Sequence, residues 1–369
     1  MKMKKIALLT SSRADYSIYY PLLCALEKSD RFDLNIIAFG SHLSHYHGYT
    51  LDLIKNDGFK KIIAIDTAMS DDKEDSISIS MGLTQVRMAE LWKNNNFDLL
   101  ICIGDRYEMF AAVSSALPFN LKIMHLHGGE KSLGAIDNSF RHAITSMSNI
   151  HLTSCDFHQD RVREIVEYEF RKNIYNVGAP ALHNINSMEL FSKQQFLTEF
   201  KVDLNSPTIL FTYHPETINL DINIKNIEEI IGVFDSINMN ILITLPNTDS
   251  MSSHIRKRLI SYSKANDNVF TFNYLGVKGF YSAIKHCSFM MGNSSSGIIE
   301  AASLGCRVIN IGDRQKGRCC NDNVIHCKPH AKDIIKAINE IQNLKKYDGD
   351  NIYYQKDSLK KIIKIIENS

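Results

Sequence analysis

Short apolar runs rich in β-branched residues alternate with amphipathic helical patterns along almost the whole length of this chain. Such alternation is typical of β-α-β units, in which a helix connects neighbouring parallel strands. The expected strands fall into two series: 5–10, 34–39, 61–65, 99–103, 122–127 and 151–154, and then 208–212, 240–244, 269–272, 288–291 and 307–311. The sequence therefore predicts an α/β protein built on parallel sheets.

A turn-rich segment, 176–180, separates the two series of strands. Helices are expected between the strands of each series: 16–27, 85–94, 109–117 and 138–147, and then 227–237, 253–265, 279–286 and 331–344. We therefore expect two doubly wound, Rossmann-like domains facing a cleft, at 1–178 and 179–355. The last segment, 356–369, contains an apolar-faced helix that needs a partner surface, and we expect it to pack on the N-terminal domain. Residues 70–76 (SDDKEDS) are expected to form a solvated loop.

Composition excludes several classes of protein. A chain of 369 residues can bury two cores, and 44% apolar with 22% charged residues is typical of a soluble globular protein. The net charge of +1 gives no reason to expect nucleic-acid or membrane-surface binding. The apolar run 6–9 is too short for a signal peptide, and no run reaches transmembrane length, so a cytoplasmic protein is expected.

The eight cysteines lack paired Cys-x-x-Cys spacing. Cys319, Cys320 and Cys327 could hold a soft metal ion, but reduced structural thiols are the favoured interpretation for all eight.

The serine-rich turn 292–300 (GNSSSGIIE) follows an apolar strand and leads into an expected helix. The first N–H groups of a helix lack internal partners, and Ser294 and Ser295 add hydroxyl donors, so the turn is suited to a diphosphate. Glu300 would repel a phosphate but can accept hydrogen bonds from a neighbouring ribose. The alternative interpretation is an ordinary serine N-cap.

Charged side chains follow two strands of the first series. Arg13 follows the first strand and suits a phosphate or carboxylate, unless it merely pairs with Asp15. Asp105 and Arg106 follow the strand 99–103. Asp105 is a candidate general acid or base, and its alternative role is a helix cap.

The segment 125–130 (HLHGGE) places two histidines on one face of a strand end, ahead of a carboxylate. His125, His127 and Glu130 suggest zinc, but no further pair with metal-ligand spacing occurs nearby, so we do not expect a metal. The next helix carries Asp137 and Arg141 on one face, four residues apart. They offer a carboxylate positioned by a guanidinium, or else an ordinary surface ion pair.

In the second half, His214 and Arg314 follow strands of the same expected sheet as the serine-rich turn. Ligands of open α/β sheets bind at the carboxyl ends of the strands. Taken singly, His214 could be a core histidine and Arg314 a surface residue. Together, the groups predict that this domain holds a nucleotide while the first domain presents carboxylates.

With these residues assembled, the chain resembles the hydrolysing UDP-N-acetylglucosamine 2-epimerases of bacterial sialic acid synthesis. The resemblance covers nearly the full length. Its motifs are SRADYS (12–17), GDRYE (104–108), HLHGGEK (125–131), DNSFRHAIT (137–145), HPET (214–217), GNSSSGIIE (292–300) and NIGDRQKGR (310–318). Non-hydrolysing relatives open with a Gly-Thr-Arg-Pro-Glu type of motif instead, so the hydrolysing branch is favoured.

The resemblance implies a glycosyltransferase-B-like pair of domains, usually in a homodimer or homotetramer. It implies elimination of UDP from UDP-N-acetylglucosamine to give 2-acetamidoglucal, followed by hydration to N-acetylmannosamine, without a nicotinamide or metal cofactor. The implied partner is a small-molecule nucleotide sugar, with neither nucleic acid nor membrane.

Residue roles carried over by motif complete these expectations. The implied catalytic residues are Asp105, Glu130, Asp137, His127 and Arg141. The implied substrate and UDP ligands are Arg13, Ser17, Arg106, His214, Asn247, Ser294, Ser295, Glu300 and Arg314. Non-hydrolysing relatives have a catalytic Glu at the position of His127, so either His127 takes that role or Glu130 does.

Three alternatives stay open at this point. The same chemistry could act on UDP-2,4-diacetamido-2,4,6-trideoxyglucose, as in legionaminic acid synthesis. The scaffold could instead serve a glycosyltransferase, which would need an acceptor, or a nucleotide-sugar sensor without turnover.

Overall fold

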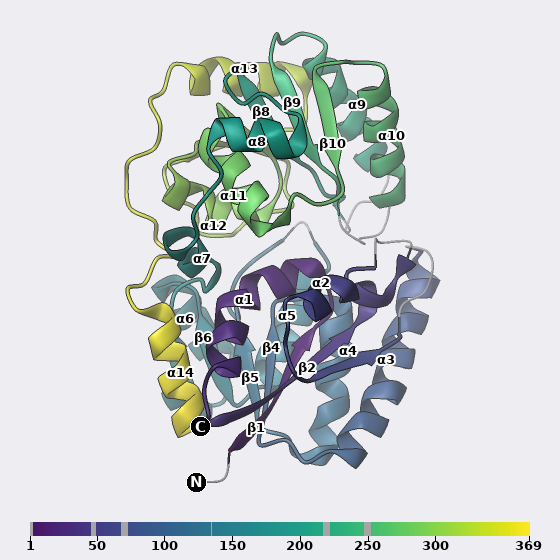
Figure 1. The fold of residues 1–369 in the computed structure, drawn as a ribbon, viewed down its shortest axis with the longest axis vertical. Coiled ribbons are helices and arrows are strands. Elements are labelled where there is room, and N and C mark those ends of the chain that lie inside the picture. The colour runs from purple at the N-terminus through teal and green to yellow at the C-terminus, as the bar shows by residue number, and fades with distance from the viewer. Residues whose placement is uncertain (1–2, 46–48, 68–72, 134, 217–221, 247–251) are drawn as a thin grey trace. The chain divides into compact units, whose positions relative to one another are not determined.

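The computed structural model describes residues 3–45, 49–67, 73–133, 135–216, 222–246 and 252–369 (Figure 1). The chain divides into two compact units. The first consists of residues 1–130, 137–184 and 353–369, and the second of residues 131–136 and 185–352. The expected segments were 1–178, 179–355 and 356–369. In the structure 131–136 group with the second unit, where the Leu133 amide donates to the Lys316 carbonyl at 3.1 Å.

Within its described residues, the first unit is built on a seven-stranded parallel sheet in the order β3-β2-β1-β4-β5-β6-β7. Its strands are β1 (Lys4–Thr10), β2 (Phe32–Phe39), β3 (Ile62–Ile65), β4 (Leu99–Ile103), β5 (Ile123–Leu126), β6 (Ile150–Thr153) and β7 (Ile174–Asn176). Its helices are α1 (Arg13–Glu27), α2 (Leu51–Asn56), α3 (Glu74–Asn94), α4 (Tyr107–Ala116), α5 (Asp137–Met147), α6 (Asp156–Ile165) and α14 (Ser358–Asn368), and α7 (Ala181–Ser187) leads out of it.

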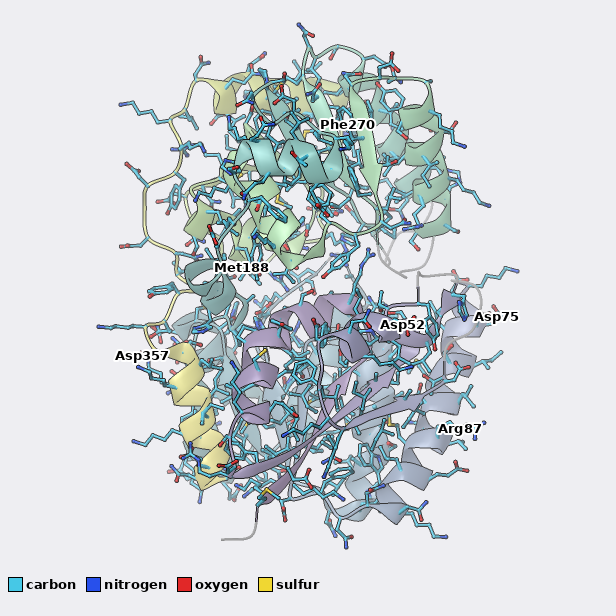
Figure 2. All side chains as sticks on the ribbon, viewed as in Figure 1. Asp52, Asp75, Arg87, Met188, Phe270 and Asp357 are labelled. Atoms are coloured by element: carbon cyan, nitrogen blue, oxygen red, sulfur yellow. The ribbon has the colours of Figure 1, made fainter. Side chains whose placement is uncertain are left out.

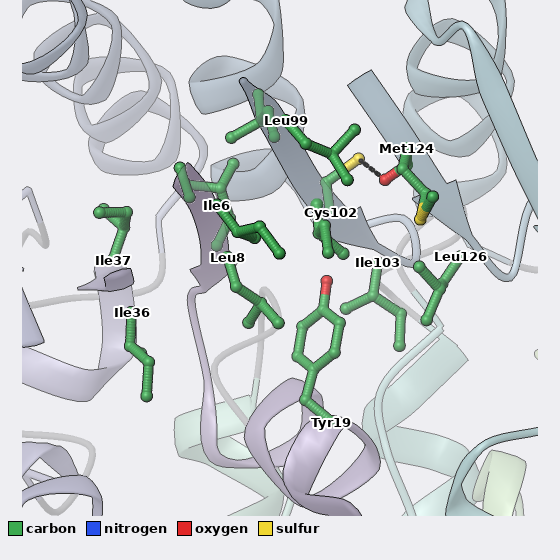
Figure 3. Packing of buried hydrophobic residues seen from close by; sticks show 14 of the residues in the cluster. Ile6, Leu8, Tyr19, Ile36, Ile37, Leu99, Cys102, Ile103, Met124 and Leu126 are labelled. Atoms are coloured by element: carbon green, nitrogen blue, oxygen red, sulfur yellow. Dashed lines mark hydrogen bonds between the residues drawn. The ribbon is translucent and has the colours of Figure 1, made fainter. Parts of the chain in front are cut away.

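The core of this unit lies between the sheet and its helices. The strands β1 and β4 contain continuous apolar runs. This pattern is expected because they are central parallel strands, which are covered on both faces. Figure 3 shows Tyr19 reaching from α1 toward this sheet, close to Leu8 and Ile103. Its hydroxyl is fully buried, and burial raises the pKa of Tyr19 well above its usual value. The packed core holds the ends of β1, β4 and β5 in fixed positions.

The last helix, α14, belongs to the first unit. Its apolar face places Ile362 and Ile366, both fully buried, in the core beside α1. The Lys4 ammonium donates to the Ile366 carbonyl at 2.7 Å, which ties the helix end to β1. Segments from opposite ends of the sequence therefore share one core, and Figure 1 shows this helix beside the sheet of its own unit.

Among its described residues, the second unit contains a six-stranded parallel sheet in the order β10-β9-β8-β11-β12-β13. Its strands are β8 (Thr208–Thr212), β9 (Asn240–Thr244), β10 (Val269–Phe272), β11 (Phe289–Gly292), β12 (Val308–Ile311) and β13 (Val324–Cys327). Its helices are α8 (Lys193–Phe200), α9 (Ile222–Phe234), α10 (Ser252–Lys264), α11 (Gly276–His286), α12 (Ser295–Ile299) and α13 (Ala331–Gln342). Two apolar clusters, one on each face, complete the two-faced covering of a doubly wound fold.

Local structure differs from the expectation at one segment, adds two strands, and shows the length of one expected helix. Residues 74–76 are not a loop, because α3 begins at Glu74. Two acidic residues favour its first turn, and every fourth residue from Ser76 to Trp92 is buried. The outward residues of this helix include Asp75 and Arg87 (Figure 2). The short strands β7 and β13 were missed. The helix after the serine-rich turn has five residues, because Ala301–Leu304 tightens into a 3-10 turn.

Two further expectations concern cysteines and membranes. All eight cysteines lie in the described residues, and no disulfide joins them there. Within the described part of the chain, the longest apolar helices fall short of what would be needed to cross a membrane.

Candidate active site

In the first unit, the direction of winding reverses between β1 and β4. The chain runs from β1 outward to β3, returns to place β4 beside β1, and then continues to β7. In open α/β sheets ligands bind beside such a switch point, at the carboxyl ends of the strands. Arg13 follows β1, Asp105 follows β4 and His127 follows β5. Because these three parallel strands are neighbours, the three predicted site residues lie at the same edge of the sheet.

Arg141 joins two of the predicted groups. Its side chain, only 1% exposed, forms an ion pair with the Asp105 carboxylate, whose side chain is 26% exposed. Its Nη1 also donates to the backbone carbonyl of Glu130 at 2.9 Å. The sequence placed Arg141 and Asp137 on one helix face, and the structure adds an ion pair between the Arg141 guanidinium and Asp105. Asp105 does not act as a helix cap, because α4 begins after Arg106 without a side-chain cap.

Arg106 is directed toward Glu108 rather than left open for a ligand. Its Nε and one Nη donate to the two carboxylate oxygens of Glu108 at 3.1 and 3.2 Å. Burial raises the pKa of Glu108, and the Arg106 guanidinium opposes that rise. The predicted phosphate contact of Arg106 would have to compete with this bidentate pair.

The two histidines at the end of β5 differ in their surroundings. His125 lies inside β5, and its Nε2 contacts the Gly104 carbonyl at 2.9 Å while its Nδ1 contacts the Thr145 hydroxyl at 3.2 Å. Burial lowers the pKa of His125 to about 3, so the ring is neutral. With both nitrogens engaged by protein groups, His125 is unavailable as a ligand for the zinc ion that the motif suggested.

His127 sits at the very end of the strand and in an unusual backbone conformation. Its φ of 63° lies in the left-handed region, which a residue with a side chain seldom adopts. Its amide still donates to the Leu152 carbonyl at 3.0 Å, and its Nδ1 lies 2.6 Å from Glu130 Oε1. Glu130 is 2% exposed and also accepts a hydrogen bond from the Ser154 hydroxyl at 2.8 Å.

Gly129 explains how this turn closes. A Cβ on Gly129 would stand 2.3 Å from the carbonyl oxygen of His158, and its φ is +79°. The Gly129 carbonyl in turn accepts from Arg161 Nε at 3.0 Å. The turn therefore lies directly on the start of α6, and this contact positions Glu130.

The remaining predicted residues of the first unit begin two helices. At the start of α1, the Asp15 carboxylate accepts from the Ser11 amide at 2.7 Å and forms a capping box with Ser12. The Ser17 hydroxyl donates to the Arg13 carbonyl at 2.8 Å, inside the same helix. Asp137 is the first residue of α5, one turn before Arg141, and it is partly exposed.

The second unit repeats the switch-point arrangement between β8 and β11. The Asn293 side chain accepts from the His214 amide at 2.7 Å and donates to the His214 carbonyl at 2.8 Å. Gln315 Nε2 donates to the Asn293 carbonyl at 2.8 Å, and Glu216 Oε1 accepts from the Asp313 amide at 3.0 Å. Side-chain-to-backbone bonds thus fasten together the ends of β8, β11 and β12.

The serine-rich turn has the form of a capped but very short helix. The Ser294 hydroxyl accepts from the Ser296 amide at 3.3 Å, as a helix cap does, and Ser294 and Ser295 stay partly exposed. Because α12 has only five residues, the helix dipole contributes less here than the sequence suggested. Glu300, 7% exposed, closes α12.

His214, Ser294 and Arg314 therefore follow three neighbouring strands, β8, β11 and β12, as predicted from the sequence. Asn247 lies outside the described residues. Sequence reasoning missed Asn293, Gln315 and Ser154, which act through other residues. The position of Asn293, between a strand and a serine turn, was the available signal.

Comparison with known proteins identifies the family of this chain. The family model described as UDP-N-acetylglucosamine 2-epimerase matches residues 24–367. The chain is 31% identical over 375 residues to the polysialic acid biosynthesis protein P7 of Escherichia coli, covering 99% of this chain and 94% of that one. It is 32% identical to the hydrolysing GDP/UDP-N,N'-diacetylbacillosamine 2-epimerase of Campylobacter jejuni, covering 93% and 88%. It is 31% identical to the hydrolysing UDP-N,N'-diacetylbacillosamine 2-epimerase of Legionella pneumophila, covering 95% and 92%.

Solved structures share the fold. The UDP-GlcNAc 2-epimerase of Neisseria meningitidis bound to UDP-GlcNAc superposes with a TM-score of 0.81 at 15% identity, covering 99% of this chain and 100% of that one. The Methanocaldococcus jannaschii UDP-GlcNAc 2-epimerase in complex with UDP-GlcNAc and UDP gives 0.81 at 17% identity, with the same coverage. The two parallel sheets thus form a glycosyltransferase-B-like epimerase fold, and the chain belongs to the UDP-N-acetylglucosamine 2-epimerase family.

Proposed function

We propose that this protein is a hydrolysing 2-epimerase that converts UDP-N-acetylglucosamine and water to N-acetylmannosamine and UDP, for sialic acid synthesis. In the first step a base removes the proton from C2 of the sugar, the C1–O bond breaks, and UDP leaves with its electron pair. In the second step water adds to C1 of the resulting 2-acetamidoglucal, and C2 receives a proton on the opposite face. The reaction therefore needs proton-transfer groups and an electrostatic hold on the leaving diphosphate.

One observation carries the proposal: Arg141 holds the Asp105 carboxylate by an ion pair and the turn of the His127–Glu130 pair by a backbone hydrogen bond. A buried guanidinium keeps a carboxylate ionised and fixes its direction. An imidazole paired with a carboxylate is suited to taking up and releasing a proton. We assign the acid–base work to these groups together with Asp137.

The second unit supplies the hold on the diphosphate. His214, Ser294, Ser295 and Arg314 offer donors at the ends of three adjacent strands, and the bonds of Asn293 keep two of those ends in register. We assign Glu300 to the ribose, since its carboxylate accepts hydrogen bonds but repels phosphate. Arg13 of the first unit is assigned to the substrate phosphate, and Ser17, Arg106 and Asn247 to secondary contacts.

The relatives favour the hydrolysing reaction and leave two sugars in contention. Two of the relatives at 31–32% identity are hydrolysing epimerases of UDP-N,N'-diacetylbacillosamine, and a third is a polysialic acid biosynthesis protein. The second candidate function is therefore the same reaction on UDP-2,4-diacetamido-2,4,6-trideoxyglucose. The two sugars differ at C4 and C6, and a pocket built to hydrogen-bond a hydroxyl rejects an analogue that lacks it.

The test is turnover of each nucleotide sugar in deuterated water without an acceptor. We expect UDP and N-acetylmannosamine from UDP-N-acetylglucosamine, with solvent deuterium at C2 of the product. Release of UDP only from the diacetamido sugar would transfer the assignment to the second candidate. A product without deuterium at C2 would refute the elimination, and turnover that requires an acceptor would indicate a glycosyltransferase.

A further inference from the structure

The side chains around Glu130 form a directed chain of hydrogen bonds. His158 Nδ1 lies 2.9 Å from the Ser154 hydroxyl, and that hydroxyl donates to Glu130 Oε1. His127 Nδ1 approaches the same oxygen at 2.6 Å. An oxygen that accepts from the Ser154 hydroxyl acts as an acceptor toward its other close partner as well, which is the role of an ionised carboxylate. Glu130 is therefore fully engaged inside the protein, and it is 2% exposed.

The direction of these bonds assigns the tautomer of His127. Because Glu130 Oε1 is an acceptor, the proton of the His127 ring sits on Nδ1. The other nitrogen, Nε2, is buried and has no hydrogen-bond partner among the described residues. A buried cationic N–H without an acceptor would cost far more than a buried lone pair. With the proton on Nδ1, the lone pair on Nε2 is available to take a proton.

The backbone at His127 supports a functional reason for this placement. For a residue other than glycine, a left-handed backbone conformation costs on the order of 1–3 kcal/mol, and residues in this conformation cluster at active sites. His127 keeps φ at 63° although glycines follow it directly in the chain. The neighbouring His125 shows the contrast, because both of its nitrogens contact protein groups.

We propose that His127 is the base that removes the C2 proton, and that Glu130 is a positioning residue that acts through His127. The proposal rests on the function proposed above. The C2–H bond breaks as Nε2 takes the proton, its electron pair forms the C1–C2 double bond, and the C1–O pair leaves with UDP. The new imidazolium is stabilised by the Glu130 carboxylate at Nδ1. The proton leaves Nε2 before the next turnover.

The experiment compares three variants with the wild-type enzyme. His127→Gln removes the base, and we expect turnover to fall by roughly 10²–10⁴-fold. His127→Gly suits the left-handed backbone and leaves space for a free imidazole, so added imidazole should restore part of the lost turnover. Glu130→Gln keeps an acceptor for Nδ1 but removes the charge. We expect a loss of about tenfold and a shift of the acid limb of the kcat/KM profile to lower pH, since a carboxylate favours the protonated ring.

The outcomes separate the two proposals. A wild type that releases no UDP from either nucleotide sugar overturns the proposed function itself. If the wild type turns over, two results overturn only the role of His127. One is a Glu130→Gln enzyme as impaired as His127→Gln, which would make Glu130 the base. The other is a His127→Gly enzyme that binds UDP and keeps its circular dichroism spectrum but is not rescued by imidazole.

Discussion

The turn after β5 in the first unit and the turn after β11 in the second both lie at the carboxyl ends of their sheets, yet they are built from different interactions. The turn after β5 orients charged and titratable side chains against one another. It holds the His127–Glu130 pair, and its Glu130 carbonyl accepts from Arg141, which also pairs with Asp105 at the end of β4. The turn after β11 orients backbone, through side chains such as Asn293 and Gln315 that bond to main-chain atoms.

Under the proposed function, this difference in construction corresponds to two different tasks. A proton transfer needs titratable groups held within a fraction of an ångström, and buried pairs supply that precision. A diphosphate is recognised by many donors at once, and a fixed backbone with small hydroxyls supplies them. We therefore expect damage to the first turn to lower turnover, and damage to the second to lower nucleotide affinity.

Asp105→Asn tests the comparison with the largest expected effect. The amide keeps the shape of the carboxylate but cannot accept a proton, so turnover should fall by roughly 10²–10⁴-fold. The dissociation constant of UDP, measured by calorimetry, should stay within about threefold, because no assigned UDP ligand changes.

Asp160→Asn is the matched control, because Asp160 pairs with Arg163 on the exposed surface of the same unit. Surface pairs contribute about 0–1 kcal/mol, so this variant should keep wild-type turnover. An Asp105→Asn enzyme that loses UDP affinity in step with turnover would break the division of work between the turns.

Gly292→Ala probes the second turn. A Cβ on Gly292 would stand 2.0 Å from the Thr212 carbonyl oxygen, and its φ is +130°, so β11 must move away from β8. Strain of about 1–3 kcal/mol at that place should weaken UDP binding by roughly tenfold or more. Gly232→Ala, on an open helical position of the same unit, should leave affinity unchanged.

Gly129→Ala is the counterpart of that change in the first turn, where a Cβ would meet the His158 carbonyl oxygen at 2.3 Å. If the comparison holds, this variant loses turnover while its UDP affinity stays near that of the wild type. Equal losses of affinity in the Gly129 and Gly292 variants would show that the turns are not specialised.

Much of this arrangement could be predicted because parallel sheets follow simple rules. The strand 99–103 was placed correctly, since a continuous apolar run ends at Gly104, and the strand-end rule then selected Asp105, His127 and His214. Sequence spacing cannot choose partners across the fold. It placed Arg141 on the same helix face as Asp137, but the ion pair with Asp105, which follows another strand, depends on the fold.

Weak local signals account for the other misses. The strand β7 has three residues and runs into a glycine-containing turn, so its pattern is too short to detect. The start of α3 was hidden in a polar segment whose buried residues are Ser76, Ser80 and Thr84 rather than apolar ones. Asn293 has no sequence signature as a link between strands, because its role exists only once β8 lies beside β11.

The substitution Ile362→Ala tests whether the stability of the first unit depends on its C-terminal helix, α14. Ile362 is fully buried in the core of that unit, and truncating such a side chain typically costs about 2–5 kcal/mol. The free energy of unfolding, measured in urea, should fall by that amount, with UDP affinity unchanged under native conditions. Ile335→Ala, 37% exposed on α13, should shift stability by less than about 0.5 kcal/mol.

The smallest expected effect is on the pH dependence of the free energy of unfolding. Burial lowers the pKa of His42 and His151 to about 4 and that of His125 to about 3, and all three belong to the first unit. An unfolded histidine titrates near 6.5, so between that pH and about 4 the unfolded chain binds more protons than the folded one. Above pH 6.5 these three rings therefore take nothing from the free energy of unfolding. As the pH is lowered below 6.5, that free energy falls by at most about 1.4 kcal/mol per pH unit for each ring.

His151→Leu isolates one of these contributions. Both ring nitrogens of His151 are buried without a hydrogen-bond partner among the described residues, so leucine should fit without losing a bond. We expect urea unfolding at pH 7.5, 6.5 and 5.5 to show a shallower loss of stability in this variant, because one proton-binding site disappears from the unfolded state. His254→Leu, at an exposed position of the second unit, should leave the slope as it is. If the two variants have the same slope, the acid sensitivity does not originate in the buried rings, and the first unit is no more dependent on fixed titratable groups than the second.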